Sequence, residues 1–176
     1  MRTLLALTIV ASTAAAAHAG TYIGVGVGTG ANMGDEAGNS YAADGRSARL
    51  ALGYRIGPFS IEGMYSGYGF VINGDNNASY DARNLQLAGK YNFALGDNFE
   101  LFGRLGLLRS DLNARQNALD MEGDGYTFSV GAEYKVNLAV SGLGIYVDWT
   151  RNSIDLSTQK LNQTASLWTL GVNFSL

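Results

Sequence analysis

The charged side chains that could do chemistry sit at alternate positions within apolar segments of this sequence. Five are cations and four are carboxylates: Arg49, Arg55, Lys90, Arg104 and Lys135, and Glu62, Glu100, Glu133 and Asp148. A carboxylate pair such as Glu62 and Glu133 could carry out acid–base catalysis. Because the two signs nearly balance, and an unpaired buried charge is costly, we expect these residues to form a network of ion pairs instead.

Histidine and cysteine are scarce in this chain. The sequence has no cysteine, and its one histidine, His18, lies in a segment that we expect to be removed. The usual general base, the thiolate nucleophile and the commonest metal ligands are therefore missing. We expect no enzymatic activity, no catalytic residue and no bound metal or cofactor.

Two short motifs resemble ligand-binding loops only weakly. Acidic residues alternate in residues 120–125 as they do at the start of a calcium loop, but the twelfth residue counted from Asp120 is Gly131 rather than glutamate. Three glycines alternate within residues 24–28, but no helix pattern follows them, as a phosphate loop requires. We expect neither site.

The segments that carry the charged positions alternate between apolar and polar residues. Alternation is clearest in residues 47–56, 84–93 and 126–136, and weaker in residues 22–29, 59–70, 99–108, 143–150 and 165–176. A strand places alternate residues on one face, whereas a helix would scatter them around its axis. The sequence therefore predicts eight β-strands, each with one apolar face.

The connections between these strands alternate in length. Short turns are predicted at residues 57–58, 95–98 and 137–142, and long polar loops at residues 30–46, 71–83, 109–124 and 151–164. Because every long loop follows an odd-numbered strand, all four emerge at one end. This order predicts an antiparallel up-and-down meander that closes into a barrel and leaves no free edge.

Alternation alone leaves the direction of the apolar face open. A soluble lipocalin-like carrier would turn it inward, and a transmembrane barrel would turn it toward lipid. The polar face carries the nearly balanced charges and many glycines, which suit a narrow interior, while aromatic residues lie near both ends of the apolar face, as membrane-interface girdles do. We therefore predict an all-β, eight-stranded antiparallel up-and-down transmembrane β-barrel. Side chains fill an interior of this size, so we expect no open pore.

The N-terminal segment has the features of a secretory signal. Arg2 precedes an apolar stretch at residues 4–11, and Ala17, His18 and Ala19 form an A-x-A cleavage site. We expect residues 1–19 to be a cleaved signal peptide and residues 20–176 to form the barrel domain. No later run of 18 apolar residues could form a transmembrane helix.

The last predicted strand ends in a recognisable pattern of polar, glycine and hydrophobic positions, formed by Thr169, Gly171, Phe174 and Leu176. It resembles the C-terminal assembly signal of bacterial outer-membrane barrels, which most often ends in phenylalanine rather than leucine. With residues 61–65 and 128–134, the sequence resembles the small OmpA/OmpX-type eight-stranded outer-membrane β-barrel superfamily, the porin-like outer membrane protein beta-barrel domain.

This resemblance implies a place in the cell outer membrane of a Gram-negative bacterium. It implies contact with outer-membrane lipid and lipopolysaccharide, and with the barrel assembly machinery through the C-terminal strand. It also implies a role of the long extracellular loops in envelope integrity or in surface attachment, with a host or surface ligand as a candidate partner. We expect a monomer, and the net charge of −3 offers no basic footprint for nucleic acid. A narrow or gated channel through the charge network and a soluble lipocalin-like carrier remain open alternatives.

Overall fold

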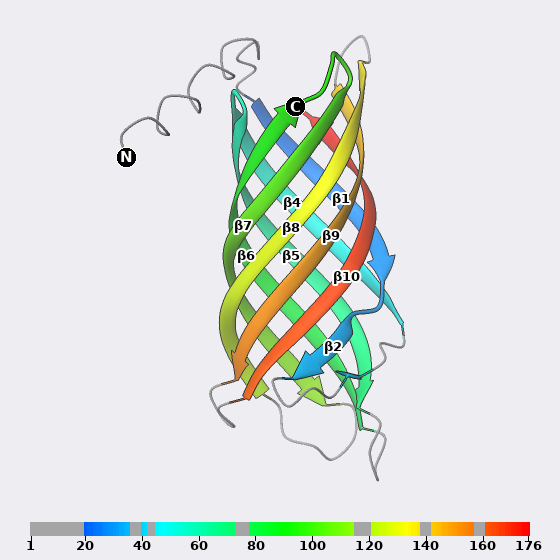
Figure 1. Cartoon of the computed structure of the whole chain (residues 1–176), viewed down its shortest axis with the longest axis vertical. Coiled ribbons are helices and arrows are strands. Elements are labelled where there is room, and N and C mark those ends of the chain that lie inside the picture. The colour runs from blue at the N-terminus through cyan, green and yellow to red at the C-terminus, as the bar shows by residue number, and fades with distance from the viewer. Residues whose placement is uncertain are drawn as a thin grey trace, which may run out of the picture.

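A closed β-barrel forms the whole described part of the chain (Figure 1). The computed structural model describes residues 20–35, 40–41, 45–72, 78–114, 121–137, 142–156 and 161–176. Eight long strands build the barrel: β1 (Gly20–Thr29), β4 (Arg46–Ile56), β5 (Phe59–Ile72), β6 (Ala78–Ala94), β7 (Phe99–Ala114), β8 (Met121–Asn137), β9 (Gly142–Leu156) and β10 (Leu161–Ser175). Each pairs antiparallel with the next long strand in the chain, so the predicted fold class is confirmed.

The first and last long strands close the barrel. β1 and β10 pair antiparallel from Tyr22 opposite Ser175 to Gly28 opposite Thr169. One more hydrogen bond, of 2.9 Å, runs from the Leu176 amide to the Thr21 carbonyl. A closed ladder leaves no strand edge unpaired, which is what a sheet surrounded by lipid requires.

Two short strands lie in the region predicted as the first long loop. They are β2 (Asn32–Asp35) and β3 (Ser40–Tyr41), and β2 pairs with β10 from Ser166 to Gln163. β10 extends beyond the point where β1 ends at Thr29, so β2 covers the edge that β10 would otherwise expose. The long polar loop predicted over residues 30–46 therefore contains two short strands that the sequence did not predict.

The other long loops are shorter than predicted, because the strands extend into them. Arg83 on β6 lies opposite Asp111 on β7, and Arg109 on β7 lies opposite Asp124 on β8, all within segments predicted to be loops. Their side chains point outward and are exposed. The apolar alternation stops where outward positions become polar, but backbone pairing continues, so the boundaries at residues 71–83, 109–124 and 151–164 were wrong.

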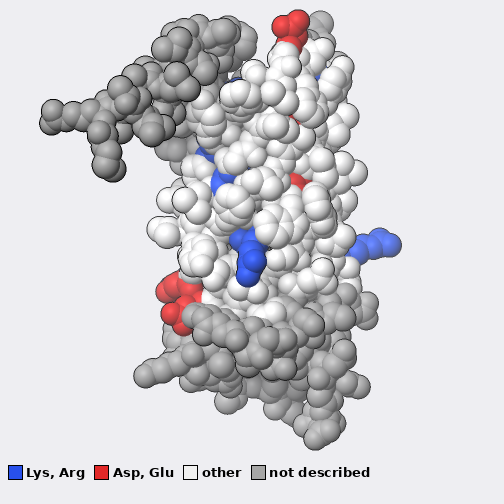
Figure 2. All heavy atoms as spheres, in the orientation of Figure 1, with Lys and Arg blue, Asp and Glu red and all other residues white. Residues whose placement is uncertain are grey.

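Alternate residues of each strand face the outside and the lumen. On β4, Leu50 and Leu52 are more than half exposed, while Arg49 and Ala51 are buried. The aromatic residues predicted near the short-turn end also point outward: Tyr54, Phe59, Tyr91, Phe93, Phe99, Tyr134 and Phe174. In Figure 2 the described wall is mostly white, and the charged side chains that stand out from it lie mainly toward the grey long-loop end. The apolar face is thus the outer face.

The two described turns at the end of the barrel opposite β2, which join β4 to β5 and β6 to β7, are short. Gly57 in the β4–β5 turn has a φ of 59°, a left-handed conformation that suits glycine. The described residues include no helix long and apolar enough to cross a membrane. The end with these turns, at the top of Figure 1, is called the short-turn end below, and the opposite end the long-loop end.

Candidate functional site: a charge network across the barrel lumen

Six consecutive strands each place one charged side chain in the middle of the lumen. They are Arg49 on β4, Glu62 on β5, Lys90 on β6, Arg104 on β7, Glu133 on β8 and Asp148 on β9. Each is at most 7% exposed. Three positive and three negative charges cancel formally, and this set is called the central cluster.

Asp148 joins two arginines of the central cluster. Its Oδ2 accepts hydrogen bonds from Arg49 Nη1 at 2.6 Å and from Arg104 Nη1 at 2.9 Å. Thr150 Oγ1 donates to Asp148 Oδ1 at 3.3 Å and accepts from Arg49 Nη2 at 2.8 Å. β4 and β9 are not neighbours in the sheet, so the bond from Arg49 to Asp148 crosses the lumen.

Glu62 is the second junction of the central cluster. It accepts a hydrogen bond from Arg104 Nε at 2.5 Å and another from the Tyr22 hydroxyl, and Lys90 Nζ lies 3.7 Å from its Oε1. Lys90 also donates to Glu133 Oε2 at 3.1 Å.

The two remaining barrel strands, β1 and β10, carry no charged residue but contact the central cluster through polar side chains. Asn173 on β10 donates to Glu133 at 3.1 Å, and Tyr22 on β1 donates to Glu62. The Lys90 ammonium lies 4.3 Å from the centre of the Phe102 ring, within the range of a cation–π contact. All eight barrel strands therefore contribute a side chain to the central cluster or to its partners.

A smaller cluster lies toward the short-turn end and consists of Arg55, Glu100 and Lys135. Arg55 binds Glu100 with two parallel hydrogen bonds of 2.9 and 2.8 Å, and Lys135 Nζ donates to Glu100 Oε1 at 2.6 Å. The side chains of Arg55 and Lys135 are 20% and 32% exposed. This set, called the end cluster, carries a net positive charge and lies partly in solvent.

The structure brings all nine predicted charged residues into ion pairs. Lys90 lies between Glu62 and Glu133, so both members of the pair weighed for acid–base chemistry are bound to a cation. Among the described residues, no group of three or more carboxylate, histidine or cysteine side chains could hold a metal ion. The arrangement fills the middle and the short-turn end of the lumen with cross-linked ion pairs.

The long-loop half of the lumen has a different lining, which the sequence reasoning missed. Its inward positions carry uncharged polar side chains: Ser47, Tyr68, Asn84, Ser110, Thr127 and Asn152, all buried. We call this set the neutral tier. The available signal was the absence of charge at inward positions in the long-loop half of each strand, but serine, threonine and asparagine did not stand out from other polar residues.

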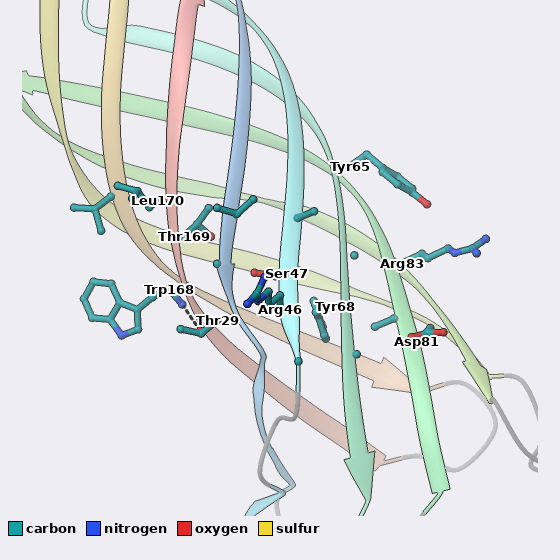
Figure 3. A pocket seen from close by; sticks show the side chains of 18 residues that line it. Thr29, Arg46, Ser47, Tyr65, Tyr68, Asp81, Arg83, Trp168, Thr169 and Leu170 are labelled. Carbon is teal, nitrogen blue, oxygen red and sulfur yellow. Dashed lines mark hydrogen bonds between the residues drawn. The ribbon is translucent and has the colours of Figure 1, made fainter.

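A groove of about 930 Å³ lies in the barrel wall where β1 ends and β4 begins. In Figure 3, Trp168 and Leu170 lie on one side of it and Tyr65 and Arg83 on the other. Gly67 and the buried side chains of Ser47 and Tyr68 also line the groove. The groove therefore combines aromatic rings with arginine side chains near the long-loop end.

The predicted C-terminal signal residues lie on β10, the strand that closes the barrel. Phe174 and Leu176 point outward and are exposed, while Thr169 and Gly171 face the lumen and are buried. A Cβ atom at Gly171 would lie 2.4 Å from both the Tyr146 ring and a β1 carbonyl. Only glycine fits that position without a shift of its neighbours.

A barrel closed by backbone pairing, apolar outside and charged inside, defines an integral membrane β-barrel. The sequence profile of the outer membrane protein beta-barrel domain matches residues 3–175, and the chain belongs to this family. It is therefore a protein of the outer membrane of Gram-negative bacteria, and the soluble lipocalin-like alternative is wrong.

Solved structures of outer-membrane proteins have the same fold. The Neisserial surface protein A, NspA, is 16% identical, with a TM-score of 0.64 over 89% of this chain and 97% of its own. Ail of Yersinia pestis, crystallised with the heparin analogue sucrose octasulfate, is 12% identical, with a TM-score of 0.61 over 90% of this chain and 99% of its own. OprG of Pseudomonas aeruginosa is 14% identical, with a TM-score of 0.54 over 90% and 96%. A comparison with curated protein sequences gives no significant match.

Proposed function

We propose that this protein is a non-enzymatic outer-membrane barrel whose lumen is plugged, and that it acts at its long-loop end in envelope integrity or surface attachment. The central cluster carries this proposal. Its six charged side chains cross the lumen and are at most 7% exposed. Ions that passed would have to break several buried ion pairs at once, and breaking such pairs is costly.

Planar-bilayer recording tests the plug. The purified protein, reconstituted with a heat-modifiable gel shift as the control for a folded barrel, should give no sustained ion conductance. A narrow or gated channel through the charge network is the second candidate, because the charged side chains follow one another along the lumen. Sustained conductance by the folded protein would establish the channel and overturn the plugged barrel.

The groove supports a role in envelope integrity. Arg46 and Arg83 line it beside the rings of Tyr65 and Trp168, and such rings and cations suit the boundary between lipid tails and anionic headgroups. We propose that the long-loop end faces the cell exterior. There the headgroups belong to lipopolysaccharide, and the two arginines would bind its phosphates.

A lipopolysaccharide titration tests this contact. Each arginine near an anionic surface contributes about 1 kcal/mol, so Arg46→Ala with Arg83→Ala should weaken binding roughly 25-fold. Arg109→Ala is the matched control, because Arg109 is exposed on a strand of the same barrel but is not part of the groove lining and pairs with Glu122 at 2.8 Å. Equal losses in the control and in the double variant would contradict a specific role for the groove.

Surface attachment through the loops is supported by one observation from a protein with the same fold, the binding of a heparin analogue by Ail. Parts of the predicted loops, residues 36–39, 42–44, 73–77, 115–120 and 157–160, fall outside the described residues, so the ligand is left to a binding screen. Host or environmental glycans, tested on whole cells with and without this protein, should be retained only by cells that carry it. Equal retention would leave envelope integrity as the function.

Export and assembly complete the proposal. β1 begins at Gly20, the residue where we expect the mature chain to start, and N-terminal sequencing of the purified protein tests that cleavage site. The proposed signal of Thr169, Gly171, Phe174 and Leu176 would engage the barrel assembly machinery before β10 pairs with β1. The eight long strands close into a ring, which supports a monomer, and crosslinking in membranes tests that state.

A further inference from the structure

The groove at the end of β1 reaches both faces of the barrel wall. β1 and β4 stop at the pair of Thr29 and Arg46, whereas β10 and β5 on either side of them continue toward the long-loop end. Val27 and Ala48, which face outward, line the groove, and so does Ser47, which faces the lumen and is 4% exposed. A ligand in the groove therefore contacts both the lipid-facing surface and the rim of the lumen.

Two hydroxyl groups without partners lie on the lumen side of the groove. Ser47 on β4 and Thr169 on β10 both lie opposite Gly28 of β1, and all three residues line the groove. Ser47 Oγ and Thr169 Oγ1 are buried and have no hydrogen-bond partner among the described residues. A Cβ atom at Gly28 would lie 2.6 Å from Ser47 Oγ, so glycine keeps the space beside this hydroxyl open. Both hydroxyls can therefore bond to a polar atom of a ligand.

The lipid-facing side of the groove has a floor of small residues between larger side chains. Ala48 on β4 and Gly67 on β5 lie directly opposite each other and form this floor. The nearest heavy atom to a Cβ at Gly67 would be the Ala82 carbonyl oxygen, at 3.6 Å, so the space over the floor is open. Figure 3 shows Leu170 on one side of it and Tyr65 on the other. Apolar side chains with a few polar groups are typical of binding sites for small molecules.

The charged and apolar parts of the groove follow one another along the strands. Arg46 lies opposite Thr29 at the long-loop end of the groove, and Ala48 lies opposite Val27 one outward position closer to the middle of the barrel. A membrane lipid has the same order, with its charged headgroup at the surface and its acyl chains toward the midplane. An anionic lipid in the leaflet at the long-loop end therefore matches the groove in charge and in direction.

We propose that the groove is a binding site for one acyl chain of a lipid in that leaflet, and that Ser47 and Thr169 hydrogen bond to the ester or hydroxyl oxygen near its headgroup. The acyl chain lies over Ala48 and Gly67, and the headgroup lies toward Arg46. For its headgroup this site rests on the proposed contact with lipopolysaccharide phosphates, to which it adds a place for the chain.

Quenching of Trp168 fluorescence by a brominated acyl chain tests this site. The protein has two tryptophans, of which Trp168 lines the groove, so Trp149→Phe leaves Trp168 as the only reporter. In detergent micelles with increasing amounts of a dibrominated monoacylglycerol, quenching should saturate at a low mole fraction of that lipid. Gly67→Leu, which fills the floor, should raise the mole fraction for half-quenching about tenfold.

Gly63→Leu is the matched control for Gly67→Leu. Gly63 also faces outward on β5 with open space around it, but it is not part of the groove lining, so its substitution should leave half-quenching unchanged. Equal effects of the two substitutions, or quenching that never saturates, would overturn the proposal. Heat-modifiable migration shows which variants fold, and Ala48→Leu fills the same floor should Gly67→Leu fail to fold.

The two hydroxyls have their own test. Ser47→Ala with Thr169→Val should raise the mole fraction of monoacylglycerol for half-quenching about fivefold, the effect of one net hydrogen bond. A brominated alkane of the same length has no oxygen, so its quenching should not change in this double variant. Equal changes for both probes would contradict hydrogen bonding by the hydroxyls.

A charged probe separates the acyl-chain site from the phosphate contact. Arg46→Ala with Arg83→Ala should weaken the quenching by dibrominated phosphatidylglycerol, but not that by the uncharged monoacylglycerol. If this double variant weakened phosphatidylglycerol while Gly67→Leu changed neither probe, the acyl-chain site would be wrong and the phosphate contact would stand. The reverse pattern would support the acyl-chain site and contradict the phosphate contact alone.

Discussion

The two halves of the lumen are filled by different kinds of side chain, charged in one half and uncharged but polar in the other. Toward the short-turn end, the central and end clusters fill the barrel with ion pairs, and Asp148 alone holds two arginines at 2.6 and 2.9 Å. Toward the long-loop end, seven polar atoms of the neutral tier have no hydrogen-bond partner among the described residues. Ion pairs therefore cross-link one half of the lumen, while the described inward residues of the other half form no ion pair across it.

This difference indicates that the ion pairs make the larger contribution to the rigidity of a narrow barrel. Each buried charge needs several partners at once, and those partners come from strands on different sides of the lumen. A hydroxyl or a neutral amide costs less to bury and can accept a water in place of a protein partner. We expect the ionic half to dominate the response to substitution.

The largest effect should come from Asp148→Asn. The change leaves Arg49 and Arg104 with one uncompensated buried charge, which should lower the free energy of unfolding by about 3–5 kcal/mol. Urea titration of the protein in lipid vesicles, read by heat-modifiable migration, measures the loss. Asp97→Asn in an exposed turn is the matched control and should be neutral. A loss below about 1 kcal/mol would remove the distinction between the two halves.

An arginine placed on the outer wall of the barrel tests whether a charge there is as well tolerated as the paired charges in the lumen. Leu52 is 58% exposed on the outer face of β4, the strand that also carries Arg49. Leu52→Arg should lower the free energy of unfolding in vesicles by about 2–4 kcal/mol, because its charged side chain would face lipid. Leu52→Ala is the size control, and equal losses in the two variants would contradict a lipid-facing wall.

The sequence was sufficient for the strands and their faces, because lipid on one side and a packed lumen on the other enforce a period of two, as in residues 84–93. It was not sufficient for strand ends, since Arg83 and Asp111 lie in paired backbone outside the apolar pattern. Nor could the sequence predict which cation forms an ion pair with which carboxylate. Arg49 reaches Asp148 across the lumen, and that match depends on the stagger between strands, which no local pattern encodes.

The end cluster should be less sensitive than the central one. Glu100→Gln removes the charge that holds Arg55 and Lys135, but both cations are partly exposed and can turn to water. We expect a loss of about 1–3 kcal/mol in the same vesicle titration, smaller than for Asp148→Asn. A loss as large as that of Asp148→Asn would mean that the number of ion pairs, rather than their burial, sets stability.

The smallest effect should come from an ion pair outside the lumen. Arg109 and Glu122 lie 2.8 Å apart on the outer surface near the long-loop end, and their side chains are 61% and 68% exposed. Water and salt screen such a pair, so Arg109→Ala should lower the free energy of unfolding by less than about 1 kcal/mol. The shortest distance equals that of Arg55 to Glu100, but Glu100 is more buried and accepts three hydrogen bonds where Glu122 accepts one from Arg109. Urea titrations at low and high salt should show the small loss of Arg109→Ala disappearing as salt rises, while that of Asp148→Asn persists. If both losses fell equally with salt, the central cluster would be open to solvent ions, and the plug would have to be abandoned.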